Sequence, residues 1–301
     1  TTPIAAAHVP MACTELVPTM DFFVATLGFR IDAIFPADAP ATAILSGYGL
    51  TLHLSRHVTE GTPALRLLCT DPDAVAGGQR DLVAPNGVHI RLSHIDPPMH
   101  APLTQQALVV SRRTGDAEWS VGRAGLRYRD LLPARHGGAF IASHIAILDG
   151  GPVPDYVHFH KVRFQMIFCR KGWVKVVYQG QGEAFVMQAG DCVLQPPTIR
   201  HRVLESSAGA EVVEIGSPAE HITMADHAMP LPNAPLPPEH LYGGQRFTRH
   251  VSATAPWTPW RLPGFEAQVT GIEAATDGLA GVRVVRVDPH APVSRRAQQH
   301  A

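Results

Sequence analysis

The feature that most constrains this chain is a set of three histidines carried by two short stretches between residues 150 and 205. His158 and His160 are separated by one residue, so in an extended strand both side chains lie on one face. His201 follows a Gly-Asp turn and a Pro-Pro corner, at the start of another apolar alternating run. The spacing therefore predicts that three imidazoles converge inside one small β-structure, where a metal ion can bind them.

The composition indicates a small-molecule partner. The chain has 301 residues, of which 45% are hydrophobic and 17% are charged, and its formal net charge is −1. This balance argues against disorder, a nucleic-acid groove and a polybasic membrane patch. No apolar run reaches the roughly 18 residues that span a bilayer, and the chain does not open with a signal-peptide pattern. The length suits about two or three compact domains.

The numbers and spacing of cysteine and histidine indicate which metal and redox chemistry the chain can support. The cysteines form no C-x-x-C pair, which argues against a zinc ribbon and against a disulfide framework. A reducing cytoplasm fits this pattern, and inert buried thiols are expected. Histidine is abundant, with 17 copies, and neutral imidazole suits most divalent transition metals.

Hydrophobic periodicity predicts an N-terminal α+β domain over residues 1–96. A strand is expected first, then a helix ended by Gly28, then three strands. The predicted ranges are 8–14 for the first strand, 17–27 for the helix, and 29–35, 41–45 and 50–55 for the later strands.

This order of elements resembles the vicinal oxygen chelate (glyoxalase-like) module. Two stretches of sequence carry the resemblance, HVPMACTELVPTMDFFVATLGF and the later APNGVHIRL. The resemblance implies a metal-ligand position at His8 and a glutamate where Arg91 stands. An arginine cannot ligate, because it is always protonated. We therefore expect a degenerate module with a structural or binding role, in which His8 and His53 are ordinary strand residues.

Short, evenly spaced strands separated by Gly- and Pro-rich gaps follow from about residue 120, which predicts an antiparallel sandwich or barrel. The predicted ranges are 126–131, 140–148, 164–169, 173–178, 183–188, 191–195, 201–205 and 211–215.

Two linkers divide the chain on this interpretation. One lies at residues 97–103, and the other at 228–239, where the density of proline excludes a helix or a central strand. The resulting domains are 1–96, 99–230 and 240–301. The last segment has strand-like stretches but little apolar surface, and it is interpreted as a partial second barrel.

The central segment resembles the cupin superfamily in two motifs. The first is a Gly, then H-x-H, a Glu and a Gly, and here Gly151, His158, His160, Gln165 and Gly172 follow it. The spacing from Gly151 to His158 is one residue longer than usual, and Gln165 replaces the acid.

The second motif is a Gly, a Pro and a His, matched by Gly190, Pro196 and His201, with Thr198 where a Gly is usual. The two resemblances together imply a mainly β fold, namely a cupin double-stranded β-helix (jelly-roll) barrel preceded by an α+β glyoxalase-like domain.

The cupin resemblance implies one divalent transition metal held by His158, His160 and His201. Iron is the first expectation, with zinc, nickel, manganese and copper as alternatives. Gln165 is either a fourth ligand through its amide oxygen or a neighbour of the ligands. Three neutral imidazoles leave the ion its full positive charge, which favours an anionic substrate. Tyr156 and Arg163 are the candidate substrate-binding residues, with a packed tyrosine and a solvated arginine as the alternative interpretations.

Three functions remain open at this point. The first is a mononuclear non-haem iron dioxygenase-like enzyme acting on a small aromatic or phenolic acid. The second is a non-catalytic cupin that binds or senses a metal or small ligand, and the third is a redox-neutral zinc or manganese isomerase or lyase. The expected partners are a small molecule and a second copy of the chain, as a homodimer.

Overall fold

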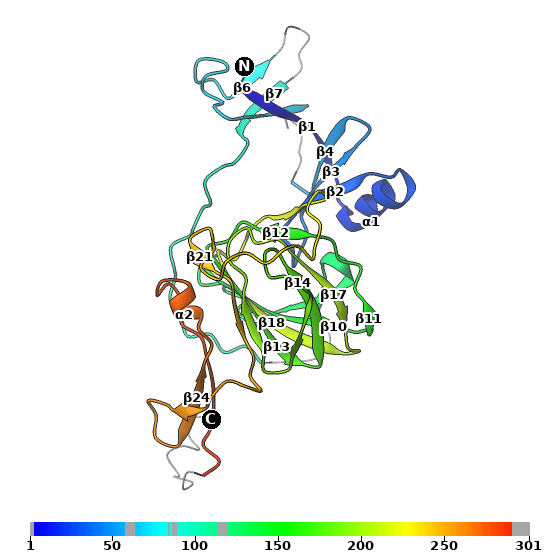
Figure 1. Ribbon diagram of the computed structural model, residues 1–301. Coiled ribbons are helices and arrows are strands. Elements are labelled where there is room, and N and C mark those ends of the chain that lie inside the picture. Colours follow the sequence, from blue (N-terminus) through cyan, green and yellow to red (C-terminus); the bar gives the residue numbers. More distant parts are fainter. Residues whose placement is uncertain (1–2, 58–63, 84, 86–88, 113–118, 291–301) are drawn as a thin grey trace.

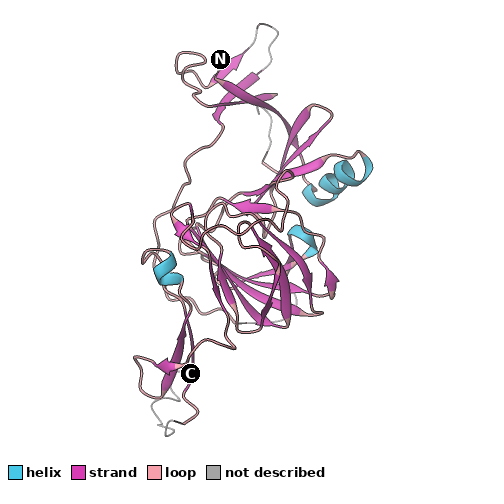
Figure 2. Ribbon diagram, viewed as in Figure 1, coloured by secondary structure: helices cyan, strands magenta, loops and turns pink. Residues whose placement is uncertain are grey.

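The structure is a computed structural model that describes residues 3–57, 64–83, 85, 89–112 and 119–290 (Figure 1). The fold is mainly β, as predicted, and its helices are short (Figure 2). No described helix has both the length and the apolar character needed to cross a membrane.

The N-terminal strands follow the predicted order of strand, helix and three strands. The helix α1 begins at Leu16, continues as a π-helical turn and ends before Gly28, whose positive φ of 72° fits a helix end. One face of the sheet packs against α1 through a cluster that includes Leu45 and Leu52. The elements of this region are β1 (Ile4–Ala12), α1 (Leu16–Asp21), β2 (Arg30–Phe35), β3 (Thr42–Gly47), β4 (Leu50–Ser55), β5 (Leu65–Cys69), β6 (Asp81–Val83) and β7 (His89–His94).

The central region folds as two facing antiparallel sheets, and the chain crosses between them repeatedly, as in a jelly roll. Side chains from both sheets meet in one core that includes Ile145, Val176 and Val212. The first sheet contains β11 (Gly151–Pro152), β12 (His158–His160), β14 (Trp173–Tyr178), β15 (Phe185–Gln188), β17 (His201–Ser206) and β19 (Thr223–Ala225). The second contains β8 (Ser120–Val121), β9 (Arg127–Asp130), β10 (Ile141–Ile147), β13 (Phe164–Lys171), β16 (Cys192–Leu194), β18 (Ala210–Ser217) and β22 (Thr248–His250).

The expected barrel needs one correction. In the part of the chain that the structure describes, no ladder of hydrogen bonds joins the two sheets, so the barrel is an open sandwich. Strands from outside the central region extend both sheets. β19 pairs with β2, which makes one sheet run from the sandwich into the N-terminal region, and β16 pairs with β22.

The C-terminal segment both adds to the sandwich and extends beyond it. β22 is part of the second sheet, whereas β23 (Thr258–Pro259), β24 (Phe265–Val269) and β25 (Arg283–Val287) form a separate three-stranded sheet. The short pair β20 (Leu241–Tyr242) and β21 (Gln245–Arg246) precedes them, and α2 (Ile272–Ala275) lies between β24 and β25. In Figure 1 the sheet that contains β24 lies at the opposite end of the molecule from the N-terminus.

Candidate metal centre

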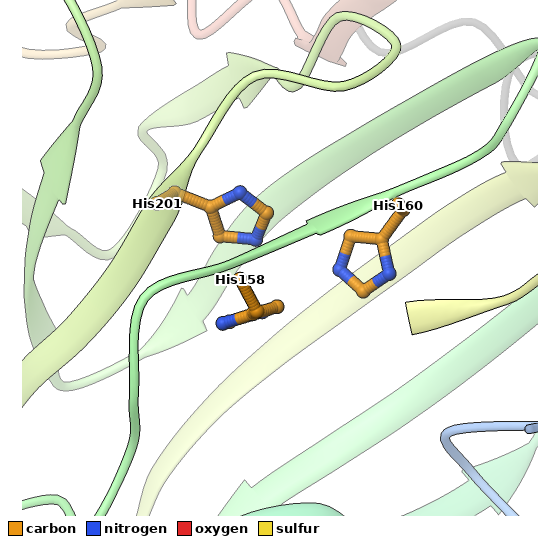
Figure 3. Close-up of side chains that lie close together, drawn as sticks. All are labelled: His158, His160 and His201. Carbon is orange, nitrogen blue, oxygen red and sulfur yellow. The ribbon is translucent and has the colours of Figure 1, made fainter. Parts of the chain in front are cut away.

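Three imidazoles meet inside the sandwich because neighbouring strands carry them in register. His158 and His160 are the two ends of β12, and His201, which opens β17, is directly opposite His158 across the antiparallel pair. The ring centroids of His158 and His201 are 4.3 Å apart, and His160 lies 5.1 and 5.2 Å from these two rings (Figure 3). One ligand atom from each ring lies within 4.8 Å of the others.

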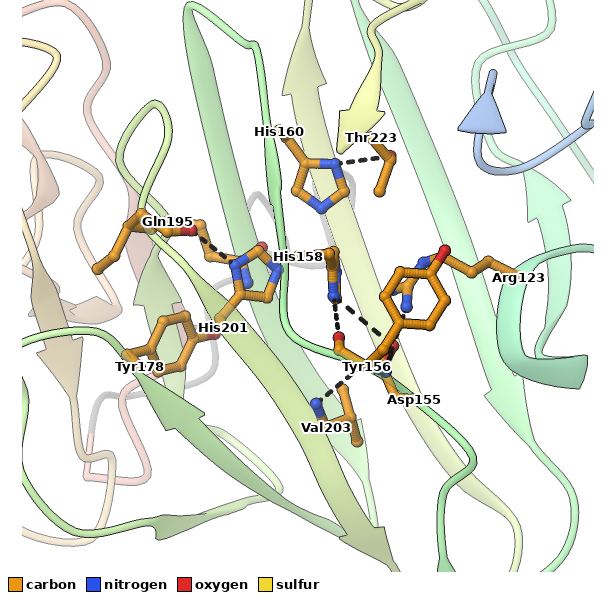
Figure 4. A network of polar contacts seen from close by, with 11 residues as sticks. Arg123, Asp155, Tyr156, His158, His160, Tyr178, Gln195, His201, Val203 and Thr223 are labelled. Carbon is orange, nitrogen blue, oxygen red and sulfur yellow. Dashed lines mark hydrogen bonds and ion pairs between the residues drawn. The ribbon is translucent and has the colours of Figure 1, made fainter. Parts of the chain in front are cut away.

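The hydrogen bonds at Nδ1 leave Nε2 free on the rings. His158 Nδ1 donates to the carbonyl of Tyr156 at 2.8 Å, and His201 Nδ1 donates to the carbonyl of Ile199 at 3.0 Å. Carbonyl oxygens only accept, so both rings carry their proton on Nδ1 and present the Nε2 lone pair. His160 Nδ1 is 2.9 Å from the hydroxyl oxygen of Thr223 (Figure 4), which can accept in the same way.

Burial keeps these rings neutral, as metal ligation requires. The exposed fractions are 0% for His158, 7% for His160 and 5% for His201. Desolvation by burial lowers the pKa of His201 to about 4 and holds the pKa values of His158 and His160 well below their usual 6.5, with neighbouring positive charge adding to the effect.

The environment of His158 Nε2 indicates whether the three histidines suit a metal ion. His158 Nε2 is fully buried and has no hydrogen-bond partner. A buried polar atom without a partner costs about 1–3 kcal/mol, and a lone pair that binds a cation removes this cost. Together with two further buried imidazoles, this atom forms a donor set that suits a divalent transition metal.

A buried ion pair lies behind His158. Arg123 and Asp155 form it with side-chain exposures of 8% and 1%. The Asp155 carboxylate accepts the backbone N–H groups of Tyr156 and Val203, both at 2.9 Å, and one of its oxygens lies 3.6 Å from His158 Nδ1 (Figure 4). Burial alone would lower the pKa of Arg123, but the charge of Asp155 raises it, so the guanidinium stays charged. This pair fixes the loop that positions His158.

Gln165 faces the same interior, but part of its amide is already engaged. Its exposure is 2%, and its Nε2 donates to Glu214 Oε1 at 2.6 Å. Only the amide oxygen therefore remains for a metal. Glu214, on the neighbouring strand β18, restores a carboxylate beside the position where the cupin motif has its acid. It is not part of the three-residue ligand group.

The space around the rings is small and closed in by apolar side chains. Its volume is about 80 Å³. Polar groups also line it, among them Arg123, Tyr128, Gln195, Arg202 and Glu214. Tyr178 lies beside His201, with a centroid separation of 5.4 Å, and accepts a hydrogen bond from Gln195 Nε2 at 2.9 Å.

The two predicted substrate-binding residues lie outside this space. Tyr156 does not line it, although its ring is 5.9 Å from that of His158 and beneath the guanidinium of Arg123. Arg163 is exposed, and its side chain does not line the cavity. The structure thus gives no support to Arg163 as a substrate contact and supplies Arg123 as a buried cation instead.

Other histidines in the sequence have different partners. His144 is buried and hydrogen-bonds Glu211 at 2.8 Å. His8 and His53 lie with their rings 6.3 Å apart in the N-terminal sheet, and Arg91 pairs with Asp81. In the described residues, the cluster at His158 is the one group of three side chains that could hold a metal.

Similar proteins were found among solved structures only. No protein-family model matches the sequence, and no curated protein sequence is significantly similar to it. An RmlC-like cupin from Shewanella frigidimarina is 26% identical, over 38% of this chain and 95% of that one, with a TM-score of 0.31. KdgF from Halomonas sp. is 18% identical, over 33% and 86% of the two chains, with a TM-score of 0.28. Lactobacillus farciminis oxalate decarboxylase, in a formate complex, is 14% identical over 63% and 68%, with a TM-score of 0.41.

Proposed function

We propose that this chain is a metal-dependent cupin enzyme with a mononuclear site, which acts on a small anionic organic molecule by dioxygenase-like chemistry. The observation that carries the proposal is the convergence of three buried imidazoles, one of which has an orphaned Nε2. His158, His160 and His201 would hold one divalent ion, with iron as the first choice. When bound, iron(II) supplies open coordination positions and the electrons that dioxygen chemistry requires.

Residues of the chain give the cavity a positive charge, exclude water from it and limit its size. Arg123 places a permanent positive charge at the cavity wall, partly offset by Asp155. Apolar side chains such as Val174 and Met187 exclude bulk water, which strengthens every electrostatic interaction inside. A volume of about 80 Å³ is well below the roughly 300–1,000 Å³ that is usual for pockets of organic ligands. The reacting end of the substrate is therefore expected to enter first.

Glu214 favours a second candidate function. An amide at position 165 cannot move protons, but Glu214 is hydrogen-bonded to that amide and lines the same cavity. A carboxylate there can serve as a general base or acid. A redox-neutral isomerase or lyase that uses zinc or manganese as a Lewis acid is the alternative this residue supports.

Metal analysis followed by a substrate screen tests the proposal. Protein purified without a histidine tag should contain close to one transition-metal ion per chain, and the iron(II) form should consume oxygen with at least one of a panel of phenolic, aromatic and thiol acids. Oxygen uptake by none of them, with turnover of a substrate by the zinc or manganese form, would select the redox-neutral enzyme.

The matched variants are His160→Ala and His144→Gln. His160→Ala should abolish metal binding, because it removes one of three ligands. His144→Gln alters a buried histidine outside the site and should leave the metal content unchanged. Normal occupancy in His160→Ala would refute the ligand assignment.

A further inference from the structure

A large cavity lies away from the three imidazoles. Its volume is about 1330 Å³, and it lies between the N-terminal sheet and the sandwich segment that leads into β19. The N-terminal side contributes residues of strands β1 to β5 and β7, and the other side includes Pro218, His221 and Met224. Ligand pockets for small organic molecules commonly measure about 300–1,000 Å³, so this cavity has room for an organic ligand with some water.

Strand alternation makes the floor of this cavity polar. Val9, Leu45 and Leu52 point to the face that packs with α1, whereas their neighbours point the other way. His8 on β1 and Arg66 on β5 are direct partners across an antiparallel pair, and both line the cavity. His53, on β4, lies beside them.

Arg66 is a half-buried cation that has no acidic partner among the described residues. Its Nη1 lies 3.3 Å from His53 Nδ1, and its Nε is buried without a hydrogen-bond partner. No described carboxylate lies within ion-pair distance of it, in contrast to Arg80 and Arg91 on the same domain, which pair with Asp73 and Asp81.

The two histidines beside Arg66 add hydrogen bonding, and the Asp32 carboxylate, which also lines the cavity, lies near His227 and forms no ion pair with Arg66. Burial, followed by the charge of Arg66, lowers the pKa of His8 and brings that of His53 to about 4. Both rings are therefore neutral at physiological pH. With no third metal ligand beside them among the described residues, an anion fits this site better than a metal ion.

We propose that this cavity is a second ligand site, which binds a small organic anion with its carboxylate on Arg66 and its apolar body between the two sides. Ile44 and Leu68 on the sheet and Met224 on β19 supply the apolar contacts. Arginine binds carboxylates through paired N–H groups, and the end of the Arg66 guanidinium that lines the cavity would provide them.

The second site borders on the metal centre without sharing its ligands. His221 lines the large cavity and packs edge-on against His160, with ring centroids 5.3 Å apart. The anion site requires no metal, so it stands whether or not the enzymatic proposal holds. Metal-free protein should bind the anion as well as the loaded protein does.

Binding of 8-anilinonaphthalene-1-sulfonate, an aromatic anion, tests the proposal. The full chain, stripped of metal with a chelator, should bind this probe saturably at one site. Benzoate should displace it, and the neutral isostere benzamide should not. Equal displacement by both, or no saturable binding, would overturn the assignment of an anion site.

Four variants test where the probe binds. Arg66→Met keeps the length of the side chain but removes its charge, and it should weaken the probe's Kd about tenfold or more, whereas Arg66→Lys should lose less. Arg80→Met, an exposed arginine outside the cavity, and His160→Ala should keep the wild-type Kd. Wild-type affinity in Arg66→Met, or loss of binding in His160→Ala with Arg66 intact, would contradict the proposal. Circular dichroism of each variant verifies that it is folded.

Discussion

Each histidine of the metal centre is oriented by an oxygen atom on its Nδ1 side. For His158 and His201 that oxygen is the backbone carbonyl two residues earlier, which the local chain supplies by itself. For His160 it is the hydroxyl of Thr223, which lies 63 positions away in sequence. Such outer hydrogen bonds fix the ring and its tautomer, and their loss typically weakens metal affinity by about 10–100-fold.

The depressed pKa of His201 makes the metal-free protein sensitive to acid. Above pH 6.5 the ring is neutral in both the folded and the unfolded state; between 6.5 and about 4 only the unfolded state takes up the proton. Folding stability should therefore fall as the pH falls through this window, by about 3 kcal/mol from His201 alone. Urea unfolding at a series of pH values should show a smaller loss in His201→Gln. An unchanged pH dependence would contradict this explanation.

The sequence predicted that the three histidines converge, but it did not predict the residues that support them. The i, i+2 spacing of His158 and His160 fixes their common face, and this period is visible without a structure. Arg123 lies 32 positions away in sequence from its partner Asp155. Glu214 lies 49 positions away from its partner Gln165. No local periodicity encodes such contacts, because they arise from sheet pairing and packing.

At the scale of elements, tight turns determine which strands face each other. Gly172 joins β13 to β14 with a φ of 70° and brings Trp173 within reach of Ser207, whose hydroxyl accepts the Trp173 N–H at 3.0 Å. A side chain here would crowd Ser207 Oγ and approach Ala210 Cα at 3.3 Å. Gly209 has a similar φ of 65° but open space around it.

The two glycines provide a matched pair of substitutions. Gly209→Ala should cost about 1 kcal/mol, the usual penalty for a side chain in the left-handed region. Gly172→Ala should cost clearly more, about 2–3 kcal/mol, because backbone strain is joined by steric overlap. Equilibrium unfolding in urea measures both. Equal losses would show that crowding at Gly172 is relieved without cost.

Most strands were predictable from their alternation and their Gly- and Pro-rich boundaries, and β2 to β4 and β13 to β18 lie close to their predicted ranges. Two pairings were not predictable. β19 takes β2 as its neighbour, and β16 takes β22 from the C-terminal segment. These partners are far away in sequence, and the strands involved are only three to six residues long, so their own patterns carry little information about pairing.

Across the whole molecule, one sheet connects the metal centre to the N-terminal region. β12 carries the first two ligands, β19 pairs with β12 and supplies Thr223, and β2 pairs with β19 through Ala33 and Met224. In Figure 1 the N-terminal strands extend away from the sandwich along this line. Binding of a metal at β12 is therefore expected to change the stability of β2.

Metal binding should stabilise both regions together. A ligand at about 100 times its Kd stabilises the folded state by about 2.7 kcal/mol. Hydrogen exchange with and without bound metal should show slower amide exchange in β12 and β19 and also in β2. The His160→Ala protein should show no change on metal addition. Protection confined to the sandwich would mean that the continuous sheet does not couple the two regions.

The most direct measurement of the central claim is anomalous X-ray diffraction from crystals of the untagged protein grown with the metal it retains. The account predicts one anomalous peak about 2.0–2.2 Å from Nε2 of His158, His160 and His201, while Nδ1 of His158 and His201 stays on its backbone carbonyl. A crystal without such a peak, or a peak bound by other residues, would contradict it.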